Sequence, residues 1–187
     1  MHADAIERIL QYLRKTPYQG ISYHQGGNPS LKAYSDSNLG GDTGFERSRG
    51  GHLVVYAGGP IYWRSKIQPS TSISSCEAEY IELMESILTI SFMRNILSEL
   101  NIDLMAPTTI YVDNTSAIDI TRNPQSSKRT RHVQLRYAAS KEAVQSRVVF
   151  IEYVPSDDNV ADIFTKPLQG HLFHKHANTL TSTTGGC

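Results

Sequence analysis

Four acidic side chains fall at positions from which they could act together. They are Asp36, Glu79, Asp113 and Asp162. Carboxylates that are packed together repel one another and take up protons, and divalent cations remove that conflict. Mg²⁺ prefers oxygen ligands, and two such ions about 3.5–4 Å apart can activate a water and stabilise the leaving oxygen of a phosphodiester. The four acids therefore favour a metal site that hydrolyses phosphodiesters.

Each acid also has a structural interpretation. Asp36 could end a strand and cap a turn, and Asp113 could belong to an ordinary strand-to-helix N-cap. Asp162 could compensate a helix dipole, and Glu79 could be a partly solvated residue beside a core helix. The set is more informative than its members, because all four fall near strand ends or helix starts that can meet.

The longest predicted helix covers residues 74–100 and places Glu79. Two serines can serve as its N-cap, and an apolar stripe follows at helical spacing. The stripe consists of Tyr80, Leu83, Met84, Ile87 and Leu88, and we expect it to shift to Met93, Ile96, Leu97 and Leu100 after a break near Ile90. Glu79 borders this stripe, whereas Glu77 lies about 200° away around the helix and faces outward.

The other predicted elements give an α/β fold. We expect strands at 31–38, 50–57, 61–66, 108–112 and 148–154, and further helices at 3–15, 115–122, 133–146 and from Val160. The first three strands are joined by short glycine turns, which indicates an antiparallel meander. Helices separate the later strands, so we expect two parallel strands to complete a five-stranded mixed sheet with helices on both faces. In such sheets, ligands bind beyond the carboxyl ends of the strands.

Composition restricts the class of protein. Basic and acidic residues are balanced at 18 each, so the net charge does not indicate a nucleic-acid partner. The two cysteines, Cys76 and Cys187, form no metal-binding or disulfide pattern. There is no signal peptide and no apolar run long enough to span a bilayer, so we expect an intracellular protein without a membrane partner.

A nucleic acid would have to meet a local basic patch, which the sequence offers at Arg64, Lys66, Lys128, Arg129, Arg131 and Arg136. These residues could contact phosphates or simply line solvated surface.

Several runs resemble the ribonuclease H domain of copia-type retrotransposon Pol polyproteins. They are Tyr34-Ser35-Asp36-Ser37-Asn38, Trp63-Arg64-Ser65-Lys66, Ser74-Ser75-Cys76-Glu77-Ala78-Glu79-Tyr80, Tyr111-Val112-Asp113-Asn114 and Ala161-Asp162-Ile163-Phe164-Thr165-Lys166-Pro167-Leu168. The resemblance implies three parts: an N-terminal helix and linker from the end of the reverse transcriptase region (1–30), the ribonuclease H domain (31–168), and a C-terminal helix with a disordered tail (169–187).

The same resemblance implies a function. It suggests cleavage of the RNA strand of RNA–DNA hybrids during reverse transcription, with Asp36, Glu79, Asp113 and Asp162 holding two Mg²⁺ ions, or Mn²⁺ in their place. Ser37 and Asn114 would join the basic residues in contacting nucleic acid. The reverse transcriptase portion of the same polyprotein would be a partner. We expect the protein in the cytoplasm or in virus-like particles, with the nucleus as an alternative.

Departures from the family pattern keep a second hypothesis open. Residues Ser37-Asn38-Leu39 and Ser48-Arg49-Gly50-Gly51 differ from the usual runs, as do Gln134, Ala138 and Ala139. The loop before Asp162 lacks the histidine that helps product leave in cellular relatives, and His132 lies elsewhere. The alternative is a decayed or domesticated module that keeps the fold without activity. A transposase or integrase of related fold fits poorly, because that class lacks the first-helix glutamate.

Overall fold

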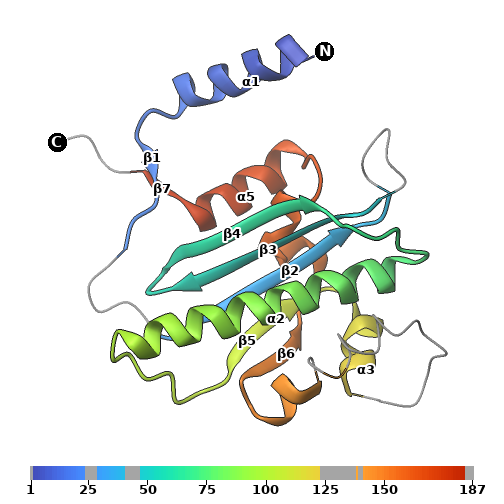
Figure 1. The fold of residues 1–187 in the computed structure, drawn as a ribbon. Helices are drawn as coiled ribbons and strands as arrows, with labels where there is room; N and C mark the ends of the chain where they lie inside the picture. The colour runs from blue at the N-terminus through green and yellow to red at the C-terminus, as the bar shows by residue number, and fades with distance from the viewer. Residues whose placement is uncertain (1, 24–28, 41–46, 123–137, 139–140, 184–187) are drawn as a thin grey trace.

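The computed structural model describes residues 2–23, 29–40, 47–122, 138 and 141–183, and a five-stranded mixed sheet forms its centre (Figure 1). The strands are β2 (Lys32–Asn38), β3 (Arg49–Tyr56), β4 (Gly59–Ile67), β5 (Thr108–Val112) and β6 (Val149–Tyr153). Their spatial order is β4-β3-β2-β5-β6. β3 pairs antiparallel with β2 and β4, whereas β5 pairs parallel with β2 and β6. The predicted meander with two further parallel strands is confirmed.

Helical elements cover both faces of this sheet (Figure 1). Helix α2 (Ser75–Glu99) crosses one face, and α3 (Thr115–Arg122) follows β5 and packs against α2. The 3-10 helix η2 (Val160–Phe164) contacts β2 and β3 from the other face, and α5 (Gly170–Leu180) packs on η2. A shorter 3-10 turn, η1 (Ser156–Asp158), precedes η2.

The main core lies between the sheet and α2. Its fully buried members include Ala33, Val54, Ile110 and Val112 from the sheet and Tyr80, Leu83, Met84, Ile87 and Ile90 from α2. These α2 positions recur every three or four residues, which keeps them on one side of the helix. We expected Leu88 in this stripe, but its side chain is 57% exposed, and Ile90 takes the next inward position instead.

The predicted break in α2 near Ile90 is wrong. The helix continues without interruption for 25 residues, because the inward spacing runs on from Ile87 through Ile90 to Leu97. Of the residues expected in a shifted stripe, Met93 packs partly against the core, but Leu100 is 63% exposed. A helix that keeps one buried face does not need a break in order to stay packed.

The C-terminal part differs most from the prediction. Val160 begins a 3-10 helix that ends at Phe164, and the terminal helix starts at Gly170. Pro167 explains the interruption, because proline lacks an N–H donor and disfavours helical backbone at the residue before it. Beyond α5, Ser182–Thr183 form strand β7, in a segment that we expected to be a disordered tail.

The N-terminal segment connects to this end of the chain. Helix α1 (His2–Lys15) confirms the helix expected at 3–15, and the short strand β1 (Gln19–Gly20) pairs antiparallel with β7. Figure 1 shows α1, β1 and β7 outside the five-stranded sheet. Most of the helix expected at 133–146 lies outside the described residues, although 141–145 are helical. Among the helices that the structure describes, none is both long and apolar enough to cross a bilayer.

Candidate functional site

Strand register brings two of the predicted acids together. In the parallel pair β2–β5, the last paired residues are Ser35 and Val112. Asp36 and Asp113 are the next residues of their strands, so both acids lie at the carboxyl end of the parallel pair, where open α/β sheets bind ligands. Asp36 is buried, and Asp113 is partly exposed.

The first turn of α2 brings in the third acid. Ser74 is the N-cap, and its hydroxyl accepts a hydrogen bond from the Glu77 backbone N–H at 3.1 Å. Glu77 in turn accepts a hydrogen bond from the Ile73 backbone N–H at 2.9 Å, so its carboxylate is part of the cap. Glu79 points toward the sheet instead and is only 5% exposed. One carboxylate oxygen from each of Asp36, Glu79 and Asp113 lies within 4.8 Å of the others.

Burial and mutual repulsion dominate the electrostatics of this group of three carboxylates. Desolvation by burial, reinforced by the charges of Asp36 and Asp113, raises the pKa of Glu79 to about 9. Burial also raises the pKa of Asp36 to about 7, and the hydrogen bond from the Thr165 hydroxyl offsets part of the effect. Removing one proton-binding carboxylate or adding a cation would relieve this repulsion.

The donor atoms fit a hard divalent cation. Glu79 Oε1 accepts a hydrogen bond from the Ser37 backbone N–H at 3.1 Å, whereas Glu79 Oε2 is buried and has no hydrogen-bond partner among the described residues. An unpartnered buried carboxylate oxygen is costly unless something else binds it. Three carboxylates in one place match the oxygen coordination that Mg²⁺ and similar ions prefer. The residues present therefore suit a divalent metal, although they do not by themselves select Mg²⁺.

Asp162, the fourth predicted acid, lies beside this group rather than within it. Its side chain is buried, and its Oδ1 is 2.8 Å from the Lys166 ammonium. Its charge contributes to raising the pKa of Asp36. Of the four predicted acids, the structure thus brings three together as one potential ligand set and places Asp162 next to it with a cation of its own.

Two polar residues that sequence reasoning missed fix Asp162 to the sheet. The buried Asn159 donates through Nδ2 to the Ser35 carbonyl at 3.0 Å and caps η2 by accepting from the Ala161 N–H at 3.2 Å. The Thr165 hydroxyl bonds to Asp36 and lies 3.1 Å from the Asp162 carbonyl oxygen. An asparagine directly before a short helix is a capping signal that the sequence does contain.

Close approach of η2 to the sheet depends on a glycine. A Cβ on Gly51 would lie 2.6 Å from Phe164 Cβ, which is closer than real side chains pack. Gly51 pairs with Asp36 across β2 and β3, so this contact sits directly beside the acids. Glycine within a strand often marks such a close approach. Gly51 thus allows Thr165 to reach Asp36.

The residues predicted to contact nucleic acid have varied surroundings. Ser37 supplies the N–H that holds Glu79, and the Asn114 side chain accepts from the Ala117 N–H at 3.1 Å, close to the start of α3. Arg64 is paired with Glu85 at 2.7 Å, and Lys66 is exposed near the end of β4. Lys128, Arg129, Arg131, His132 and Gln134 lie outside the described residues.

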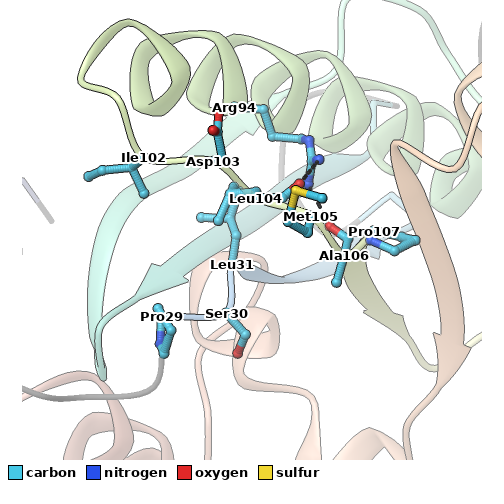
Figure 2. Close-up of a pocket in the computed structure, with 10 residues that line it drawn as sticks. All are labelled: Pro29, Ser30, Leu31, Arg94, Ile102, Asp103, Leu104, Met105, Ala106 and Pro107. Atoms are coloured by element: carbon cyan, nitrogen blue, oxygen red, sulfur yellow. Dashed lines mark hydrogen bonds between the residues drawn. The ribbon is translucent and has the colours of Figure 1, made fainter.

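A separate groove of about 270 Å³ lies away from the acids (Figure 2). It is lined by Leu31 and Pro107, which precede β2 and β5, and therefore lies at the amino ends of the strands that carry Asp36 and Asp113 at their carboxyl ends. Arg94 bonds to the Leu104 carbonyl at 2.7 Å and to the Ala106 carbonyl at 3.0 Å, which holds the loop that forms one wall. The groove offers no group of acids and is distinct from the candidate site.

Comparisons with known proteins show what the chain is similar to in sequence. The chain matches no protein-family model. It is 36% identical over 96% of its length to the retrovirus-related Pol polyprotein from transposon RE2 of Arabidopsis thaliana, and 33% identical over 92% to that from transposon TNT 1-94 of Nicotiana tabacum. It spans only 12% and 13% of the lengths of these relatives.

A solved structure confirms the fold class. LC11-RNase H1, whose crystal structure contains an RNA/DNA hybrid, superposes with a TM-score of 0.51. The likeness covers 73% of this chain and 94% of that one, at 14% sequence identity. At this identity, the likeness concerns the fold, and the predicted ribonuclease H-like architecture is confirmed.

Proposed function

Because this chain is homologous over most of its length to retrovirus-related Pol polyproteins of copia-type transposons and has the ribonuclease H fold, we propose that it is a hybrid ribonuclease. Its substrate would be the RNA strand of an RNA–DNA hybrid, which arises during reverse transcription. In the hydrolysis, a water oxygen bonds to phosphorus and the bond from phosphorus to the 3′-oxygen breaks. The products are a 3′-hydroxyl and a 5′-phosphate.

The observation that carries this proposal is the convergence of two buried carboxylates and one partly exposed carboxylate from three elements. Asp36, Glu79 and Asp113 come from β2, α2 and the end of β5, and their oxygens lie within 4.8 Å of one another. A fold alone does not give a function, but this group of acids at the ligand-binding edge of the sheet supports metal-dependent chemistry.

Roles for the individual residues follow from their positions. Asp36, Glu79 and Asp113 would hold one divalent ion, and Asp162 would share in holding a second. Bound Mg²⁺, or Mn²⁺ in its place, supplies an acidified water and stabilises the leaving oxygen. The Ser37 N–H and the Thr165 hydroxyl, which bond to Glu79 and Asp36, would orient these two carboxylates.

Substrate contacts would come from the surface around the acids. We infer that Lys66, which is exposed, contacts a phosphate. The contacts expected of Lys128, Arg129 and Arg131 stay predictions, because these residues lie outside the described part of the chain. Ser37 and Asn114 flank the acids in sequence and would approach the backbone of the cut strand. Such contacts position the duplex, and 2′-hydroxyls in the wide minor groove distinguish RNA from DNA.

The relatives supply a context for the reaction. Because they are Pol polyproteins, we infer that a reverse transcriptase portion of the same polyprotein is the functional partner. The site of action would be the cytoplasm or a virus-like particle, with the nucleus as the alternative.

The test is a cleavage assay with three end-labelled substrates: an RNA–DNA hybrid, single-stranded RNA and duplex DNA. With Mg²⁺, we expect cleavage of the RNA in the hybrid and of neither other substrate, and we expect the matched Asp113→Asn variant to be inactive. Equal cutting of all three, or cutting that persists in a chelator, would contradict the proposal. Hybrid binding without cleavage would favour the decayed module instead.

A further inference from the structure

The pairing of Asp162 with Lys166 limits what the acidic site can bind. The ammonium lies 2.8 Å from Asp162 Oδ1, and the Asp162 side chain is only 4% exposed, whereas that of Lys166 is 38% exposed. The charges of Asp36 and Asp113 also attract this ammonium. Lys166 therefore lies within the field of the whole acidic group and supplies a positive charge there without any metal.

The backbone holds this lysine in place. The N–H groups of Thr165 and Lys166 both donate to the Asp162 carbonyl, at 3.1 and 3.3 Å. Pro167 follows directly and restricts the backbone of Lys166. The Thr165 hydroxyl is anchored on Asp36, and Phe164 is packed over Gly51. The ammonium thus extends from a fixed base toward the acids, while its flexible side chain still allows it to move.

Metal binding at Asp162 has to displace this ammonium. A divalent ion on Asp162 would stand close to a like charge, and like charges repel strongly where water is excluded. The three other carboxylates form a ligand set that does not require Asp162. Resting on the proposed function, we infer that Lys166 is a tethered cation that occupies Asp162 in the hybrid-free protein, so that this form binds one divalent ion. A second ion binds at Asp162 only when a substrate phosphate attracts the Lys166 ammonium away from it.

Counting bound metal tests this inference without measuring activity. Mn²⁺ alone is titrated into the full chain, with free ion followed by electron paramagnetic resonance and heat by calorimetry. We expect one Mn²⁺ per wild-type chain and two per Lys166→Met chain, with the second site at least roughly tenfold tighter than any further binding to wild type. Adding Asp162→Asn to Lys166→Met should return the count to one.

Two variants control for charge and folding. Lys175→Met removes an equal charge from another ion-paired lysine, which binds Asp158 on a different element, and should leave one Mn²⁺. Lys166→Arg keeps the cation and should also bind one. Melting curves establish that each variant is folded before titration.

The possible failures are distinguishable. Two ions on hybrid-free wild type, or one ion on folded Lys166→Met, would overturn the role of Lys166 and leave the proposed nuclease intact. Absence of Mn²⁺ binding in every folded variant would overturn the proposed function and this inference together.

Discussion

Two buried glutamates lie one turn apart on α2 and have opposite surroundings. Glu82 is 2% exposed, and its Oε1 is 2.7 Å from Nδ1 of the fully buried His52. The other ring nitrogen of His52 is 2.9 Å from the Thr89 hydroxyl, so the pair continues into a network. Glu79 is similarly buried, but it has one backbone donor and a second oxygen without a hydrogen-bond partner among the described residues.

The difference separates a structural acid from a functional one. Burial of a charged group is tolerated when a partner and further hydrogen bonds satisfy it, as for Glu82. Glu79 instead faces Asp36 and Asp113, which repel its charge. A buried acid whose neighbours oppose its ionisation is a candidate for metal binding or catalysis, whereas burial alone is not.

The strongest way to break this comparison is to remove the charge of Glu79. We predict that Glu79→Gln lowers the rate of hybrid cleavage by on the order of 10³-fold, as loss of a charge-stabilising group does in other active sites. The fold should persist, because an amide relieves carboxylate repulsion in the metal-free protein. Single-turnover cleavage and circular dichroism of the same preparations measure both. A fully active Glu79→Gln enzyme would show that α2 presents a different residue to the metal.

The next largest effect is expected at the structural glutamate. His52→Leu would leave Glu82 buried without its partner, and breaking a buried pair on one side costs about 3–5 kcal/mol. We predict that loss in urea unfolding, with cleavage retained at temperatures where the variant is folded. The double variant His52→Leu/Glu82→Leu should recover part of the stability. Near-wild-type stability of His52→Leu would show that the pair contributes little.

Stability against pH sharpens the comparison further. An acid with a raised pKa in the folded protein holds its proton more tightly there than in the unfolded chain, so its stabilising effect is complete below the unfolded value and lost as pH rises through the folded one. For Glu79 this window runs from 4.5 to about 9, and for Asp36 from 3.8 to about 7. We predict that the metal-free protein loses unfolding free energy between pH 5 and pH 9, at up to about 1.4 kcal/mol per pH unit for each of the two groups within its window.

Matched variants identify the source of that loss. Glu79→Gln should flatten the profile, and saturating Mg²⁺ should remove most of the loss in wild type, because a cation compensates the ionised carboxylates. Unfolding free energies at several pH values, with and without Mg²⁺, provide the measurement. If neither treatment changed the dependence of unfolding free energy on pH, groups other than Glu79 and Asp36 would be responsible for it.

The smallest effect is expected at Glu77, two residues before Glu79. Its carboxylate caps α2 by accepting from the Ile73 N–H. Glu77→Gln keeps an acceptor and loses only a favourable charge near the helix start, so we predict a loss of roughly a few tenths of a kcal/mol and full activity. Comparing its melting temperature and cleavage rate with those of Glu79→Gln tests which of the two glutamates α2 directs toward the acidic site.

Periodic patterns predicted most of the fold because long amphipathic elements carry their own signal. The fourth strand, the helix at 115–122 and the start of α2 at its serine cap agree with the sequence interpretation. The sequence predicts the first turn of a longer helix at Val160, where the structure has a 3-10 helix that ends at Phe164. Five residues are too few to distinguish the repeat of a 3-10 helix from that of an α-helix. Strand β7 depends on a partner far away in the chain, which local pattern cannot reveal.

The candidate site was predictable in its residue types and less so in its connections. Strand ends and a helix start identified Asp36, Glu79 and Asp113 before any geometry was known. The pairing of Asp162 with Lys166 requires knowing where the chain turns after Phe164, and the partnership of His52 with Glu82 requires the packing of α2 on β3. The spacing of apolar residues also gave no reason to expect that Glu82 is buried, because that pattern takes account of hydrophobic residues only.

The short pairing of β1 with β7 has a consequence for how the chain folds during its synthesis. Gln19 reaches Thr181 across 162 residues, through a side-chain bond of 2.6 Å beside the two strands. At typical synthesis rates of about 5–20 residues per second, the first partner waits on the order of 10–30 s for the second. During that time α1, whose Ile6, Ile9, Leu10 and Leu13 are exposed, also lacks the contact of its Tyr12 ring with Phe173 in α5. Strand β1 therefore stays without its partner until the residues of β7 have been synthesised and released from the ribosome.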